Sequence, residues 1–103
     1  MRQFDVYVSP SEATRRIAPF VVVLQSHFLD DLPTVVVAPM LRQSERPAYE
    51  HVSIEIDFGG ERLVVSPAEM IAIDRRQLKG RKGNLGEHED LIRRAIERLF
   101  TGF

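Results

Sequence analysis

The sequence lacks cysteine and shows no marked excess of charge of either sign. Without cysteine the chain can form neither disulfides nor a cysteine-based zinc site. Its 14 Lys and Arg residues almost balance its 15 Asp and Glu residues, which gives a formal net charge of -1. Proteins that neutralise many phosphates carry a clear basic excess. The balance therefore favours a protein partner or a small ligand over direct, specific nucleic-acid binding.

Long hydrophobic runs are also missing. The longest, Ile17 to Leu24, is interrupted by Pro19, whereas a membrane-spanning helix needs about 20 apolar residues. The first residues lack the basic-then-apolar pattern of a signal peptide. We therefore expect a cytoplasmic protein with no membrane association. The length of 103 residues predicts a single domain over 1–103.

Short stretches of β-preferring residues predict most of the fold. Alternating or β-branched residues predict strands over 4–8, 19–24, 34–38, 51–58 and 62–66, with a strand-compatible segment at 70–73. Pro39 is expected to end the third strand, since proline cannot donate to a sheet ladder. The polar segment Met40 to Glu50 is predicted to be a loop. Gly59 and Gly60 predict a tight hairpin turn after the clearest strand.

The second half of the chain predicts one helix. Ser66 and Pro67 have the pattern of a capped helix start that gives only a short turn. The basic, glycine-rich segment Asp74 to Gly86 is predicted to be an exposed connection. An apolar stripe predicts a helix from about Glu87 to Thr101, ended by Gly102; its members are Leu91, Ile92, Ala95, Ile96, Leu99 and Phe100. Antiparallel strands followed by one helix indicate an α+β or mainly-β small barrel.

Residue patterns typical of catalysis are scarce. His27, His51 and His88 have no metal-site spacing, and no nucleotide-binding or nucleophile motif occurs, so we predict no metal, no cofactor and no catalytic residue. Glu55 and Asp57 share a strand face, for which alternating charge on the solvated side is the preferred interpretation. The cations of the stretch from Arg75 to Lys82 could contact phosphates, but a solvated loop is favoured because no aromatics are interleaved.

Two apolar features occur where polar residues are usual. The sequence ends Leu99-Phe100-Thr101-Gly102-Phe103, although chain ends are usually polar. Either Phe103 packs back onto its own domain, or it enters a partner's pocket, where its burial would contribute roughly 2–3 kcal/mol. Phe28 and Leu29, in a polar, turn-like stretch, leave the same choice between core packing and a contact surface.

Several motifs, taken in order, resemble the CcdB family of toxins. They are Gln3 to Tyr7, Val23 to Ser26 followed by an apolar pair and Asp30, Val36 to Met40, and a terminal helix ending in Phe100, one residue and Gly102. The similarity covers nearly the whole chain. It implies an SH3-like small barrel with a main antiparallel sheet of about five strands, a small second sheet and a C-terminal α-helix.

The resemblance also implies a function. CcdB-like toxins are homodimers that bind the DNA gyrase A subunit and trap its cleaved DNA complex without being enzymes themselves. A CcdA-like antitoxin wraps the toxin with a disordered tail and extracts it from gyrase. Carried over to this sequence, the expected gyrase-binding residues are Phe28, Leu29, Glu97, Thr101, Gly102 and Phe103. Thr101 replaces the family's tryptophan and removes a stacking surface, which Phe103, in place of a smaller aliphatic residue, compensates in part.

Two alternative functions stay open at this point. One is an mRNA endoribonuclease toxin of the MazF or Kid type, which shares the barrel and would use the stretch from Arg75 to Lys82 and His51. The other is a structural or adaptor domain without toxicity, because a shared fold does not fix function.

Overall fold

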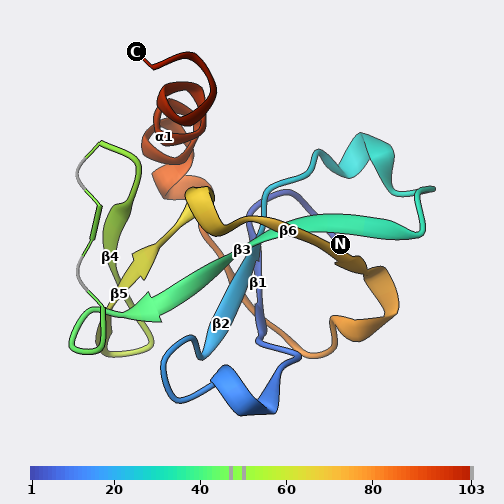
Figure 1. Ribbon diagram of the computed structural model, residues 1–103. Coiled ribbons are helices and arrows are strands. Elements are labelled where there is room, and N and C mark those ends of the chain that lie inside the picture. The colour runs from blue at the N-terminus through green and yellow to red at the C-terminus, as the bar shows by residue number, and fades with distance from the viewer. Residues whose placement is uncertain (47, 50, 103) are drawn as a thin grey trace.

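The computed structural model describes residues 1–46, 48–49 and 51–102. Within these residues the chain forms seven strands, one α-helix and several 3-10 turns (Figure 1). The strands are β1 (Asp5–Val8), β2 (Phe20–Val23), β3 (Thr34–Arg42), β4 (Ile54–Phe58), β5 (Glu61–Val65), β6 (Ile71–Asp74) and β7 (Arg81–Asn84), and the helix is α1 (Glu89–Thr101). The predicted α+β small barrel with a C-terminal helix is confirmed.

The strands form one curled antiparallel sheet in the order β4-β5-β3-β2-β1-β7, with β6 also paired to β3. β3 makes this curl, because it changes its neighbour along its length. Its first half, from Thr34 to Val37, pairs with β6, and its last residues, from Met40 to Arg42, pair with β5. The main sheet and the small second sheet implied by the resemblance are therefore continuous through β3. In Figure 1 α1 stands at the end of the sheet beside β4 and β5.

The prediction that Pro39 ends a strand, with a loop from Met40, is wrong. β3 runs through Pro39 to Arg42. Pro39 lies between the residues paired to β6 and those paired to β5, so its missing N–H interrupts neither pairing. Its carbonyl accepts a hydrogen bond from the Ser66 N–H at 3.1 Å. Residues 47 and 50 of the predicted loop lie outside the described residues.

The prediction that Asp74 to Gly86 is a connection is also wrong, although most of the segment is exposed, as predicted. This segment contains the end of β6, the 3-10 turn η4 (Arg75–Gln77) and the whole of β7, which pairs with β1. Leu78 and Leu85 within it are buried. The residues of β7, Arg-Lys-Gly-Asn, have low β-propensity, so its extended conformation depends on pairing with a distant strand.

The predicted hairpin is confirmed, with a later start. β4 begins at Ile54 because His51 has a φ of 72°, outside the extended region. Ile54 and Ile56 point into the core. Gly59 and Gly60 have φ values of 60° and 82°, the positive values that this turn requires.

The predicted turn after β5 forms as η3 (Pro67–Glu69), but Ser66 does not cap it. The Ser66 Oγ is buried and has no hydrogen-bond partner among the described residues. The Ser66 carbonyl instead accepts from the Glu69 N–H at 3.1 Å. The interpretation of Ser66 as a capping residue is therefore wrong, although the short turn itself is present.

The predicted helix is confirmed, but its apolar stripe is divided between core and surface. Ile92 and Ala95 are buried against β-strand residues that include Ile54 and Leu63. Leu91 and Phe100, by contrast, are 49% and 71% exposed. Thus part of the stripe that predicts core packing is left on the surface, in the first turn of the helix and in the last.

Candidate functional site

A shallow apolar groove lies between the 3-10 turn η2 (His27–Leu29) and the last turns of α1. We call it the η2–α1 groove. Its volume is about 290 Å³. Its lining comes from β2, η2, β3, α1 and the segments beside them, and comprises Leu24, Gln25, Ser26, Leu29, Val36, Met70, Ile96 and Phe100. Residues between Leu24 and Val36, Met70, and two residues of α1 lie far apart in the sequence and share this open apolar surface.

The turn η2 carries the apolar pair that the sequence singles out; Leu29 lines the groove and Phe28 does not. Phe28 is 87% exposed and Leu29 47% exposed, so core packing of Phe28 is excluded. The Ser26 Oγ accepts a hydrogen bond from the Phe28 N–H at 3.2 Å and thereby caps the turn. The rings of His27 and Phe28 lie 4.7 Å apart between centroids. The turn thus has a defined conformation that directs an aromatic ring to solvent.

The helix end carries the other predicted residues. Glu97 and Thr101 are exposed, and the Thr101 Oγ1 donates to the Glu97 carbonyl at 2.7 Å. Gly102 ends the helix with a φ of 79°, and its N–H donates to the Arg98 carbonyl at 2.9 Å. Phe103, the proposed apolar anchor, lies outside the described residues.

The structure brings only part of the predicted set to the groove itself. Leu29 lines it, while Glu97, Thr101 and Gly102 belong to the helix end beside it. Sequence reasoning missed Met70, Ile96 and Phe100 as groove residues. The apolar stripe of the helix contained two of them, but the pattern could not tell its buried members from its exposed ones.

A second apolar depression, which we call the β3 trough, has a volume of about 450 Å³. Its lining is mostly apolar and comes from β2, β3, β6 and the residues between β1 and β2; it includes Ile17, Val21, Val37, Pro39, Leu41, Ile71 and Ile73. Arg46 and Glu69 lie at the same depression and form an ion pair. The hydrogen bond that Arg46 donates to the Glu69 carboxylate raises the pKa of Arg46 above its usual range.

The groove and the trough open on opposite faces of the sheet. Val36 lines the groove and packs against the cluster that contains Met40, whereas Val37 lines the trough and belongs to the cluster that contains Val21. Neighbouring residues of a strand point to opposite faces. Two partners could therefore occupy the two surfaces at the same time.

Comparison with known protein families identifies the family of the chain. Residues 3–102 match the profile of a family described as CcdB protein. The chain belongs to the CcdB family. The resemblance drawn from the sequence motifs is thereby confirmed, and membership makes the chain a toxin of a toxin–antitoxin module. None of the curated proteins compared with the chain matches it.

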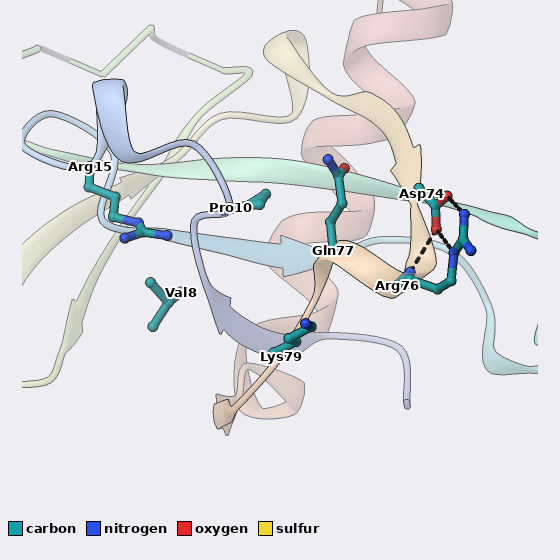
Figure 2. A pocket seen from close by; sticks show the side chains of 7 residues that line it. All are labelled: Val8, Pro10, Arg15, Asp74, Arg76, Gln77 and Lys79. Carbon is teal, nitrogen blue, oxygen red and sulfur yellow. Dashed lines mark hydrogen bonds and ion pairs between the residues drawn. The ribbon is translucent and has the colours of Figure 1, made fainter.

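The basic segment of this CcdB-family chain borders a third depression, of about 610 Å³ (Figure 2). Its lining residues are Val8, Pro10, Arg15, Asp74, Arg76, Gln77 and Lys79. Arg76 donates from Nε and Nη2 to the two carboxylate oxygens of Asp74, at 3.1 Å and 2.8 Å. These hydrogen bonds lower the pKa of Asp74 to about 2. Asp74 therefore stays ionised near neutral pH.

The three histidines of the CcdB-family chain lie in three different segments. His27 lies in η2, His51 in the turn before β4 and His88 in the 3-10 turn η5 (Gly86–His88). Across residues 1–46, 48–49 and 51–102, no three His, Asp or Glu side chains are placed to hold a metal ion. In the same part of the chain, no helix is long and apolar enough to span a membrane.

Proposed function

We propose that this CcdB-family toxin binds the A subunit of DNA gyrase and traps the cleaved DNA complex, which stops topoisomerase activity and replication. It acts by binding rather than by catalysis, in the cytoplasm, where gyrase works. The observation that supports the proposal is the exposed pair of Phe28 and Leu29 in η2, of which Leu29 lines the groove together with Phe100 of α1. An exposed apolar patch with polar surroundings is typical of a protein interaction site.

The exposed aromatics supply the energy that such a complex needs. Full burial of a phenylalanine side chain contributes about 2–3 kcal/mol, and a few such residues dominate most interfaces. Thr101 lacks the stacking surface of the family's tryptophan, but Phe28 and Phe100, which are 87% and 71% exposed, offer aromatic area for a partner to bury. Gly102 has no side chain, so a partner's backbone can approach closely. Phe103 completes the proposed contact set.

The β3 trough is the proposed docking surface of a CcdA-like antitoxin tail. It is apolar, and it lies on the face of β3 opposite the η2–α1 groove. An antitoxin bound there would not have to displace gyrase first, which suits a partner that extracts the toxin from its target. We further propose that the toxin works as a homodimer, as the family does, with no specific nucleic-acid contact of its own.

A plasmid-cleavage assay with purified gyrase tests the proposal. The wild-type protein should make cleaved plasmid accumulate, and a variant lacking Thr101, Gly102 and Phe103 should fold but neither trap cleaved DNA nor inhibit growth. A truncated variant that stays fully toxic would overturn the assignment of the helix end. A wild type that leaves gyrase cleavage unchanged would overturn gyrase as the target.

The ribonuclease alternative rests on the depression in Figure 2, and its residues support it poorly. Asp74 is ionised and bound to Arg76, and no histidine is among the described residues that line the depression. A base or acid able to exchange a proton near neutral pH is thus missing from that lining. Incubation of the purified protein with RNA in the absence of gyrase tests this alternative, and cleavage would favour it.

A further inference from the structure

The loop between β2 and β3 presents the proposed gyrase contact without support from a neighbouring strand. It contains η2 and the residues up to Thr34, and many of its side chains are exposed. A loose loop would have to be ordered when gyrase binds, and that ordering lowers affinity. What holds this loop therefore bears directly on how well Phe28 and Leu29 can bind.

One arginine holds the far end of the loop. The Arg75 Nη2 donates to the carbonyls of Leu29 and Thr34, both at 3.3 Å, and its Nε donates to the Leu32 carbonyl at 3.0 Å. Its Nη1 lies 3.5 Å from the Asp30 Oδ1. The side chain is only 21% exposed, so these contacts are partly shielded from water. A single guanidinium thus connects three residues of the loop and the first residue of β3.

The backbone of Arg75 adds a further contact, because its N–H donates to the Pro33 carbonyl at 3.0 Å. At the near end of the loop, Ser26 caps η2, and the Gln25 Oε1 accepts from the Val36 N–H at 3.3 Å. Ser26 and Gln25 come from the loop itself or its border. Arg75 is contributed from η4, more than forty positions later in the chain.

We propose that Arg75 is a positioning residue for gyrase binding, which fixes the loop in the shape that presents Phe28 and Leu29. This inference rests on the proposed function. Arginine suits the task because its planar fork carries several N–H donors at fixed angles, whereas lysine offers a single compact ammonium. The cation also faces a carboxylate, Asp30, in the loop that it holds.

The neighbouring Arg76 provides a matched control. It carries the same charge and lies in the same turn, but it is 89% exposed and donates to Asp74, not to the loop. Arg76→Ala therefore removes one cation from the same surface without touching the loop. A difference between the two alanine variants measures the contacts of Arg75 rather than net charge.

The test combines hydrogen exchange with gyrase binding on the full-length protein. In free Arg75→Ala, the amides of Phe28, Leu29 and Leu32, which are hydrogen-bonded within the loop, should exchange at least about tenfold faster. Binding to the gyrase A subunit should weaken by about tenfold. Arg76→Ala should match the wild type in both measurements. Arg75→Lys, which keeps the charge, should fall between them and serves if the alanine variant does not fold.

Every other result of the exchange and binding measurements contradicts one specific part of the proposal. Unchanged loop exchange in Arg75→Ala, or equal effects of Arg75→Ala and Arg76→Ala, overturns the positioning role. Faster exchange with wild-type affinity overturns the link between loop order and binding. Wild-type binding is measured first, since a wild type that does not bind gyrase overturns the proposed function as a whole and not only the role of Arg75.

Discussion

The Arg81 Nε lies 2.8 Å from the Asp5 Oδ1 and joins β7 to β1 across 76 positions of sequence. The Asp5 carboxylate is 2% exposed, and it also accepts from the Asn84 Nδ2 at 3.0 Å and from the Arg2 N–H at 2.8 Å. Buried carboxylates are tolerated when such donors compensate for lost hydration. This network therefore helps to hold β7, whose own residues have little β-propensity.

Removal of the Asp5 carboxylate should destabilise the fold. Asp5→Ala removes the acceptor that Arg81, Asn84 and the Arg2 N–H share, which should lower the free energy of unfolding by about 2 kcal/mol. Urea unfolding at neutral pH measures the loss. Glu12→Ala is a suitable control, because the Glu12 side chain is 88% exposed and lies 3.8 Å from its partner Arg15, so its removal should cost little.

The same carboxylate should make stability depend on acid pH. Burial alone would raise the pKa of Asp5, but hydrogen bonds from Arg81, Asn84 and Arg2 hold that pKa below its usual value. A pKa lowered in the folded state stabilises the fold above about pH 4 and loses this contribution as the pH falls further. Asp5→Asn should therefore lose less stability than the wild type between about pH 5 and about pH 2. Equal losses would contradict the pKa shift.

The hairpin turn should depend on glycine at position 60. Gly60 has a φ of 82°, and a Cβ built there meets no atom within 4 Å, so the cost of a substitution is backbone strain alone. Gly60→Ala should destabilise the protein by about 1–2 kcal/mol, and Gly60→Asn by less, because asparagine tolerates this conformation. Thermal unfolding distinguishes the two variants. A Gly60→Asn variant less stable than Gly60→Ala would refute the explanation.

Phe28 should contribute to binding and hardly to stability. Its side chain is 87% exposed, so Phe28→Ser should change the free energy of unfolding by less than about 0.5 kcal/mol. If the ring is buried against gyrase, its loss should cost about 2 kcal/mol and weaken binding roughly thirtyfold. Titration against the gyrase A subunit measures the effect. Wild-type affinity in this variant would remove Phe28 from the interface.

The opposite pattern is expected for the β3 trough. Ile71 is 60% exposed and lines it, so Ile71→Ser should weaken antitoxin binding while gyrase binding stays at the wild-type level. Pull-down or calorimetry with the antitoxin tail measures the first effect, and the gyrase titration measures the second. Loss of gyrase binding in Ile71→Ser, with antitoxin binding retained, would show that the two surfaces are assigned the wrong way round.

Local sequence was sufficient wherever the determining interactions are local. The hairpin of β4 and β5 follows from alternation and from two glycines that supply positive φ values. The helix α1 follows from its periodic stripe and from Gly102. The order of short motifs along the chain was enough to indicate the family, which the match over residues 3–102 confirms.

Tertiary structure decided what depends on distant partners. β3 continues past Pro39 because the strand residues up to Val37 pair with β6 and those from Met40 pair with β5. β7 is a strand because β1 pairs with it. In the sequence Arg75 is one of several cations in a basic segment. In the structure its guanidinium N–H groups donate to the carbonyls of residues more than forty positions earlier. Likewise, the helix stripe alone could not show that Ile92 is buried in the core while Phe100 is exposed. Backbone pairing and burial are set by which segments meet in space, and no local pattern specifies that.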